Sequence, residues 1–549
     1  MQNSSDLKYA AKNWREKLLI GFGVGALFLC IGCSGPHSDS SDSHVLNRGL
    51  IGEPESLSPH HFSSNQSASI LRDIGEGLVR YDASGALVAG VASSWSISQD
   101  GLVYVFNLRN DARWSNGDLV VANDFASAFR SLVTPDVASS NANNAEHILN
   151  APLILRGESM PSDLGVYAEG PHVLKIRLHT QTPFFIQLLA HPSMFPIHQS
   201  SGSVVADDEL RNFGVSNGAY QLSEWVVGSQ IVLNRNSDYW NDDRTFFDKV
   251  VFHVVAESSE LTRFRAGELD VTENVPSTMF KQVQDEYPDE LRVAPYLGVY
   301  YYGFNLTNSR FADAPKLRRA LSLAVDRELL VSKITGRGER AAYGWVPPGF
   351  VGYRSQRIDA SEMRKHDREA LAIRLYEESG FGPDRPLQFE LRYNTSDVQQ
   401  RIALAIQSMW REVLGADVTI VNEEFKVLIS NIRAHEITEV FRLSWTGDYN
   451  DPQTFLKLFV SSNSSNLTGY SNARYDELMK LASTKVNDLE RRTLLEEAES
   501  LMLADNPVLP LYFYVSKHLI STRIDGWEDN ILDIHGSQYL GVKSESNLP

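Results

Sequence analysis

The fold class is decided by the stretch Asp100-Gly101-Leu102-Val103-Tyr104-Val105-Phe106-Asn107-Leu108-Arg109. Its β-branched and aromatic residues follow an Asp-Gly turn signal, so residues Val103 to Leu108 are predicted to form a strand. The segment Asn123 to Leu132 has helical periodicity and opens with Asn-Asp at an expected N-cap. A strand followed by a helix is the alternation on which mixed α/β folds are built.

The same alternation extends in both directions along the chain. Further strands are expected at the short β-branched runs Val173–Leu178, Gln230–Leu233 and Val250–Val255. Further helices are expected at Leu317–Ile334, Arg368–Ser379, Val398–Leu414, Ala473–Ser483 and Leu489–Ala504. The chain shows no internal repeat, no heptad pattern and no second long apolar run. A single soluble globular body of α/β class is therefore predicted.

The N-terminal segment has the composition of a secretion signal. Four basic residues precede the apolar run Leu18–Ile31, which is shorter than the ~20 residues that a membrane-spanning helix needs. The sequence Cys30-Ile31-Gly32-Cys33 then resembles the lipobox of bacterial lipoproteins, although the usual leucine is replaced by Cys30. The resemblance implies a signal peptide over residues 1–32, a lipid anchor on Cys33 and a flexible tether over 33–43. Ordinary secretion is the alternative.

The composition of the chain argues against several classes of function and partner. Cys30 and Cys33 are the only cysteines, so the chain beyond the tether cannot form an internal disulfide and must be stabilised by its core. Its length argues for two or more folding units. The formal charge of −18 makes nucleic acid and anionic membrane surfaces poor partners. Cationic ligands such as amines fit better.

Local matches to catalytic motifs fail on their context. Gly214-Val215-Ser216-Asn217-Gly218 fits the nucleophile elbow of serine hydrolases, but the residues that follow alternate like a strand, where the elbow requires a helix. A secreted hydrolase that uses Ser216 is therefore the weaker alternative. His435-Glu436-Ile437-Thr438-Glu439 has Glu439 where a zinc protease needs its second histidine. The other histidines are scattered, so no metal, cofactor or catalysis is expected, and binding is the default function.

One loop has the residues of an ammonium-binding site. In Trp445-Thr446-Gly447-Asp448-Tyr449-Asn450-Asp451-Pro452-Gln453-Thr454-Phe455-Leu456, the carboxylate of Asp448 stands close to the large aromatic Trp445. An aspartate pairs with a cation, and a neighbouring indole strengthens that pairing by partly excluding water. The alternative is an ordinary polar turn, since Gly-Asp and Asn-Asp-Pro are common turn sequences.

A series of short motifs runs in order from about Leu46 to the C-terminal region. The motifs are Glu76–Asp82, Gly90–Trp95, Asp100–Arg109, Trp114–Asp118, Asn123–Phe125, Asn217–Tyr220, Tyr239-Trp240, Phe264–Asp270, Tyr301–Asn305, Ala324–Arg327, Val346–Gly349, Tyr393–Asp397, the Asp448 loop and Thr468–Tyr470. Through these motifs the chain resembles the oligopeptide- and dipeptide-binding proteins of bacterial ABC importers, which form family 5 of the extracytoplasmic solute-binding proteins.

The resemblance implies a two-lobed periplasmic-binding-protein fold of type II with an extra α/β subdomain. Lobe I would combine residues 44–75, 200–297 and 518–549, the subdomain would span 76–199, and lobe II would span 298–517. The protein would act as a monomer on the extracytoplasmic side, in the periplasm or at the cell envelope. It would capture short peptides between its lobes and deliver them to the permease subunits of the importer.

The resemblance also implies the binding residues. A peptide would lie as an added strand against main-chain groups near Ser63–Asn65 and Arg442–Thr446. Asp448 matches the family aspartate that pairs with the peptide α-ammonium group, Trp445 would form the wall of a side-chain pocket, and Arg442 and Arg433 would add positive charge. The full predicted set is Asp448, Trp445, Arg442, Arg433, Ser444, Thr446, Ser63 and Asn65.

Departures from the family pattern keep the ligand open. Ser63 and Asn141 stand where relatives that bind longer peptides carry an acidic residue and a tyrosine. Gln399 and Thr335 replace a histidine and a lysine that bind the peptide carboxylate in some relatives. Another solute, such as a murein peptide, a nickel chelate, haem or an oligosaccharide, is therefore the alternative within the family.

Overall fold

The computed structural model describes residues 44–201, 214–307, 310–437, 439–447, 449–485 and 487–543. All elements described below belong to one compact unit that runs from Ser43 to Pro549. Two predicted functional residues, Cys33 and Asp448, lie outside the described residues, as do the predicted signal peptide and tether. Within the described part of the chain, no helix is both long and apolar enough to cross a membrane.

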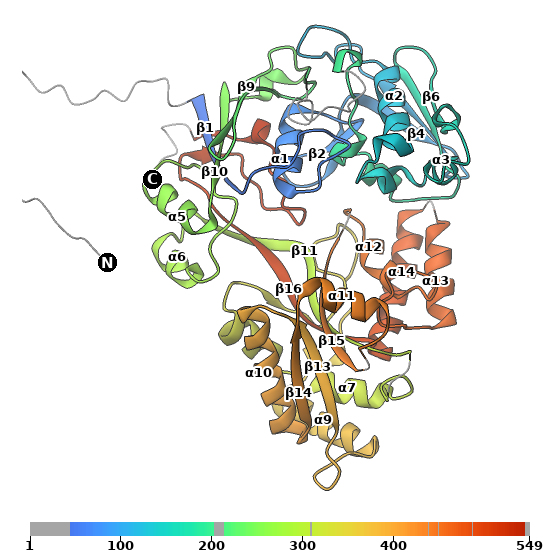
Figure 1. Ribbon diagram of the computed structural model, residues 1–549, viewed down its shortest axis with the longest axis vertical. Coiled ribbons are helices and arrows are strands. Elements are labelled where there is room, and N and C mark those ends of the chain that lie inside the picture. The colour runs from blue at the N-terminus through green and yellow to red at the C-terminus, as the bar shows by residue number, and fades with distance from the viewer. Residues whose placement is uncertain are drawn as a thin grey trace, which may run out of the picture. The chain divides into compact units, whose positions relative to one another are not determined.

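The first sheet joins segments that lie far apart in the sequence (Figure 1). Its strands, in spatial order, are β1 (Val45–Ile51), β10 (Lys249–Val255), β9 (Gln230–Arg235) and β8 (Tyr220–Val226). β1 is parallel to β10, and the other neighbours are antiparallel. The predicted strands Gln230–Leu233 and Val250–Val255 are thus confirmed. Helices α5 (Glu257–Arg265) and α6 (Phe280–Glu286) follow β10 along the chain, whereas β17 (Ile524–Asp525) and β18 (Gly541–Val542) belong to the C-terminal segment.

Helix α1 (Asn65–Ile74) packs against this sheet with one face only. The Ser64 hydroxyl caps the helix by accepting a hydrogen bond from the Ser67 N–H at 3.2 Å. The apolar side chains Ile70, Leu71 and Ile74 are fully buried in the core of the first sheet. Asn65, Ser69 and Arg72 are polar and recur at positions i, i+4 and i+7, so they share a different face. That face is available to a ligand.

The second sheet is antiparallel, with the order β4 (Ala92–Ile97), β5 (Val103–Leu108), β7 (Val173–Arg177) and β6 (Val166–Ala168). Helix α2 (Ala122–Leu132) packs on it, because Phe125 and Phe129 share a buried core with Phe106 and Ile176. The helix begins one residue before the predicted Asn123, since the Asp124 carboxylate accepts a hydrogen bond from the Val121 N–H at 3.0 Å. The remaining elements here are β2 (Val79–Tyr81), β3 (Leu87–Ala89), α3 (Ala151–Leu155) and α4 (Phe185–Leu188).

The third sheet is mixed and has six strands. Their order is β12 (Arg340–Ala341), β16 (Val508–Leu519), β11 (Leu291–Phe304), β15 (Val440–Thr446), β13 (Gln388–Asn394) and β14 (Asp417–Glu423). Alternate residues of β11 enter different cores, because side chains of a strand point to opposite faces of the sheet. Tyr300 and Tyr302 belong to one core, and Val299 and Tyr301 belong to the other.

Helices cover both faces of this six-stranded sheet (Figure 1). The core that contains Tyr300 includes residues of α7 (Pro315–Leu323), α9 (Lys365–Glu378) and α10 (Asp397–Leu414). The core that contains Val299 includes residues of α11 (Phe425–Arg433), α12 (Gln453–Leu456), α13 (Ala473–Ser483) and α14 (Asp488–Asp505). The predicted helices from Arg368 onward are confirmed within a few residues. The predicted helix stop at Gly380 is confirmed by its left-handed backbone, with a φ angle of 85°.

The single helix predicted over Leu317–Ile334 is wrong. The structure has α7, then α8 (Arg327–Leu329), and then a π-helical turn over Leu330–Thr335. Asp326 interrupts the helix because its carboxylate caps a new one by accepting a hydrogen bond from the Leu329 N–H at 3.0 Å. The buried Arg327 guanidinium holds this break in place by donating to Pro510 O at 2.8 Å and to Ser322 O at 2.9 Å.

Candidate ligand-binding cavity

A cavity of about 820 Å³ lies where the first and third sheets meet helix α1. Its wall is formed by the polar face of α1, the C-terminal ends of β1, β15 and β16, the middle of β11 at Tyr296 and Leu297, and the C-terminal segment Trp527–Gly536. The volume is within the range of about 300 to 1,000 Å³ that is typical of small-molecule sites. Segments from both ends of the chain therefore build one binding space.

Two of the predicted binding residues line this cavity. Asn65 is the first residue of α1, and Thr446 is the last residue of β15. The neighbours of Asp448 in the sequence, Gly447 and Tyr449, also line it. Asp448 itself lies outside the described residues. The fold thus brings together the two segments that were expected to bind peptide main chain.

Four other predicted residues do not line the cavity. Ser444 and Trp445 lie on β15, where they pair with Tyr300 and Val299 of β11. The Trp445 indole N–H is buried and has no hydrogen-bond partner among the described residues. Arg442, also on β15, is buried, and Arg433 is exposed at the end of α11. The roles of these four residues in binding stay predictions.

Arg442 is held by neighbours in the third sheet. Its Nη1 donates to Asn394 Oδ1 at 3.1 Å, and its guanidinium carbon lies 4.7 Å from the centre of the Tyr300 ring. Burial alone would lower the pKa of Arg442, but Tyr300 and Tyr514 outweigh this effect, so the pKa is raised. The positive charge of Arg442 is therefore favoured by residues of the fold.

Arg72 has fewer polar partners than Arg442, although the buried Nε of Arg442 also has no hydrogen-bond partner among the described residues. It lines the cavity from the last turn of α1, and its buried Nε has no hydrogen-bond partner among the described residues. No carboxylate of the described residues forms an ion pair with its guanidinium. Burial lowers the pKa of Arg72 to about 10, so it stays charged at neutral pH. The sequence reasoning missed this residue, although its spacing from Asn65 on one helix face was a usable signal.

Lys517 is a second cation in the cavity wall. It lies on β16, and burial lowers its pKa. Its Nζ is 3.4 Å from Val515 O, and no described carboxylate forms an ion pair with it. Arg72 and Lys517 together give the cavity positive charge that the fold itself does not neutralise through an ion pair. Such groups are suited to an anionic group of a ligand.

Ser63 lies at the N-terminal end of α1 but is exposed and does not line the cavity. Its main-chain N–H and that of Ser64 both donate to the Glu55 carboxylate, the latter at 2.8 Å. Partial burial opposes ionisation of Glu55, but the hydrogen bonds from Ser64 and Ser63 lower its pKa to about 2. The ionised Glu55 thus occupies N–H groups that were expected to be open to a peptide.

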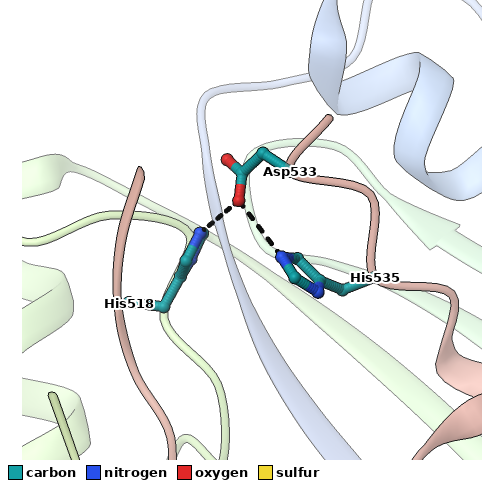
Figure 2. A group of neighbouring side chains, drawn as sticks. All are labelled: His518, Asp533 and His535. Carbon is teal, nitrogen blue, oxygen red and sulfur yellow. Dashed lines mark hydrogen bonds and ion pairs between the residues drawn. The ribbon is translucent and has the colours of Figure 1, made fainter. Parts of the chain in front are cut away.

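A cluster of two histidines and one aspartate forms another part of the cavity wall (Figure 2). Asp533 Oδ1 lies 2.7 Å from His518 Nε2 and 3.1 Å from His535 Nε2. His518 is buried, and its Nδ1 lies 2.9 Å from Thr272 O. The sequence reasoning missed this cluster because Asp533 and His535 are separated from His518 by an irregular segment.

Within the described residues, neither of the two rejected catalytic motifs has the structure of an active site. Ser216 is buried and is followed by strand β8, so the helix that a nucleophile elbow requires is missing there. His435 follows α11 with a left-handed φ angle of 55°, and Glu439 forms an ion pair with Arg310 at 3.2 Å. Neither segment has the geometry that its motif needs.

Comparison with known proteins finds similarity over most of the chain. The family described as bacterial extracellular solute-binding proteins, family 5, matches residues 86–466. The periplasmic oligopeptide-binding protein OppA of Salmonella typhimurium is 35% identical over 492 residues, which are 89% of this chain and 90% of that protein. The periplasmic murein peptide-binding protein MppA of Escherichia coli is 35% identical over 495 residues, or 89% and 91% of the two chains.

The fold is similar to a solved structure of the same kind. The unliganded open form of the murein tripeptide-binding protein MppA matches with a TM-score of 0.86 and 34% identity. The match covers 92% of this chain and 99% of that one. The expected α/β fold of type II binding proteins is thereby confirmed.

Proposed function

Since the chain belongs to family 5 of the bacterial extracellular solute-binding proteins, we propose that it binds short peptides for an ABC importer. The proposal is carried by one observation: Asn65 and Thr446, which come from the two segments expected to bind peptide main chain, line the same cavity. The protein would capture the peptide there and deliver it to the permease subunits. Binding and release require no catalysis by the protein.

Asp448 is the proposed partner of the peptide α-ammonium group. Gly447 and Tyr449 on either side of it line the cavity, and the Tyr449 ring stacks on Phe184 with the ring centres 4.4 Å apart. A carboxylate beside a buried aromatic ring favours a cationic group, because the ring excludes water from the pair. The main chain at the end of β15 would extend this contact to the peptide backbone.

Arg72 and Lys517 are the proposed partners of ligand carboxylates. Both line the cavity and neither forms an ion pair with a described residue. They stand in for the histidine and lysine whose positions are taken by Gln399 and Thr335. These two residues serve the fold instead: Gln399 accepts a hydrogen bond from Tyr300, and Thr335 donates one to Glu339 at 3.0 Å.

The test is a calorimetric screen with di- to pentapeptides, their N-acetylated forms and their C-terminal amides. Free peptides should bind, and acetylation should abolish binding because it removes the ammonium group. A murein-type peptide forms one arm of the screen, and sugars, haem and nickel chelates form the others. Binding of a non-peptide solute without binding of any peptide would overturn the proposal.

We also propose that Cys33 is lipidated and holds the protein at a membrane surface. Two or more acyl chains on one residue give stable anchoring, whereas a single chain gives only marginal binding. Metabolic labelling with a palmitate analogue should mark the wild-type protein but not the Cys33→Ser variant. Equal labelling of the two proteins, or none in either, would contradict the lipidation of Cys33.

A further inference from the structure

We propose that His518, Asp533 and His535 form a binding site for a divalent transition-metal ion in the wall of the ligand cavity. The three residues come from the end of β16 and from the C-terminal segment of the cavity wall. Their nitrogen and oxygen atoms lie within 4.8 Å of one another. This site goes beyond peptide binding and does not depend on it.

The geometry suits one shared ion. Both histidines direct Nε2 at the same carboxylate oxygen of Asp533, as Figure 2 shows, at distances of 2.7 and 3.1 Å. Ligand atoms around a tetrahedral zinc ion lie roughly 3.3 Å apart, as follows from metal–nitrogen bonds of about 2.0 to 2.1 Å. A small outward movement of the three groups would therefore open a position for an ion between them.

The groups around the cluster already orient its ligands. His518 Nδ1 lies 2.9 Å from Thr272 O, so that nitrogen carries a proton and Nε2 is directed toward the ion. The Thr272 hydroxyl oxygen accepts a hydrogen bond from the Leu519 N–H at 2.8 Å, which fixes the residue that contacts His518. A backbone carbonyl that accepts a hydrogen bond from the other ring nitrogen is the usual companion of a metal-binding histidine.

His535 and Asp533 are also held in place. The His535 ring stacks on Trp527, with ring centres 3.7 Å apart and an angle of 18° between the planes. The His535 carbonyl accepts a hydrogen bond from Arg48 Nη1 at 2.8 Å. Asp533 has a left-handed φ angle of 56°.

The simpler interpretation is a histidine–aspartate ion pair within the fold. Such a pair needs only one histidine, whereas here a second imidazole is directed at the same oxygen. The charges around the cluster permit a bound cation, because the nearby positive charge of Arg48 interacts favourably with the carboxylates of Asp73, Glu273 and Asp533. Two imidazoles with one carboxylate favour zinc, nickel, cobalt or copper over magnesium or calcium.

The position of the cluster decides what such an ion would bind. All three residues line the cavity, so an ion with three protein ligands would keep a coordination position open toward it. A carboxylate, an amine or an imidazole of a ligand would suit that position. The site therefore extends the chemistry that the cavity offers beyond hydrogen bonds and ion pairs.

The test is a titration of the full-length protein, first freed of metal with a chelator, with Co²⁺ alone and then with Zn²⁺ in competition. Visible absorption of Co²⁺ should show one tightly bound ion with nitrogen and oxygen ligands. The variant His535→Gln keeps a hydrogen-bond donor for Asp533 but removes a metal ligand. It should weaken Co²⁺ binding by at least about 100-fold, because loss of a direct ligand costs more than the roughly 10- to 100-fold that loss of a group hydrogen-bonded to a ligand costs.

The matched control is His198→Gln. His198 Nε2 lies 3.0 Å from Asp118 Oδ2, so this variant also disrupts a histidine–aspartate pair, but His198 does not line the cavity. Circular dichroism should give the same Tm for both variants, and if His535→Gln unfolds, Asp533→Asn replaces it in the titration. Absence of a Co²⁺ spectrum in the wild type, or equal affinity in the cavity variant and the control, would overturn the site. Peptide binding would be unaffected by that result.

Discussion

Helix α1 and strand β15 both contribute residues to the cavity wall and each carry a buried or partly buried arginine, but only Arg72 lines the cavity and the two arginines differ in their surroundings. Arg442 on β15 donates to Asn394 and lies over the Tyr300 ring, and its pKa is raised. Arg72 on α1 has no ion pair with a described residue, and its pKa is lowered to about 10. Asn394 and the surrounding tyrosines favour the first charge, whereas the second lies in the cavity wall without an ion pair to a described residue. The two arginines cannot be told apart by the sequence motifs in which they lie. They differ in the groups that contact each guanidinium.

The largest effect is expected at Asp448, which follows β15 in the sequence. Asp448→Ala should weaken binding of a free peptide by roughly 2 to 5 kcal/mol, because the peptide ammonium group would be left without its charge partner. Isothermal titration calorimetry measures the change. Asp488→Ala, which removes an exposed aspartate of α14, is the matched control and should bind like the wild type. An affinity of Asp448→Ala close to that of the control would remove Asp448 from the site.

The next effect concerns stability. Arg442→Met should lower the free energy of unfolding by about 1 to 3 kcal/mol, since it removes the partner of the Asn394 side chain. Urea unfolding followed by tryptophan fluorescence gives this value. The prediction from the sequence was a role in binding. Unchanged stability together with weaker peptide binding would support that role and remove the contrast with Arg72.

Arg72→Met should weaken ligand binding without lowering stability, which is the reverse of the effect expected for Arg442→Met. Affinity for a peptide with a free carboxylate should fall about tenfold, or about 1.4 kcal/mol, while affinity for the matching amide should not change. Stability should not fall, because burial disfavours the charge of Arg72 in the folded state and the nearby Tyr81, Tyr296 and Asp73 offset this cost only in part. Calorimetry with both peptides and a thermal melt provide the measurements. An equal loss for acid and amide would show that Arg72 does not recognise a carboxylate.

These contrasts show what could be predicted from the sequence. The strand at Val103–Leu108 and the helix that follows it were predictable, because hydrophobic periodicity and capping residues act locally. The Asp448 loop could be proposed as an ammonium-binding site because its residues are neighbours in the sequence, and this role stays a prediction. The break at Asp326 was not found, since the buried Arg327 that holds it bonds to Pro510, a contact with a distant segment.

The remaining cavity wall depends on such distant contacts. His518, Asp533 and His535 converge only after β16 has paired with β11 and the C-terminal segment has packed beside the first sheet. Arg72 was within reach, since it shares a helix face with Asn65, but whether a cation has a partner is decided by the tertiary structure. The sequence therefore indicated segments that line the cavity. It did not indicate which charged side chains of the described residues would lack an ion pair in the folded protein.

The smallest expected effect on stability concerns the contact of Glu55 with the N-terminal end of α1. The Glu55 carboxylate accepts hydrogen bonds from the N–H groups of Ser63 and Ser64, and its pKa of about 2 lies below the ordinary value of 4.5. A lowered folded-state pKa means that the stabilisation is present above about pH 4.5 and is lost as the pH falls toward 2. Glu55 is exposed, so Glu55→Gln should lower stability by only about 0.5 to 1 kcal/mol at pH 7.

Thermal melts of the wild type and of Glu55→Gln between pH 7 and pH 3 test this prediction. The difference in Tm should shrink steadily below pH 4.5, because Glu55 then takes up a proton in the unfolded protein while it is still ionised in the folded one. Glu53→Gln is the control, since Glu53 is an exposed neighbour that contacts Trp225 and Gly228 and not α1. If α1 forms the ligand-recognising wall, Glu55→Gln should also weaken peptide binding slightly at pH 7. A constant Tm difference across the whole pH range would mean that the charge of Glu55 does not fix the helix.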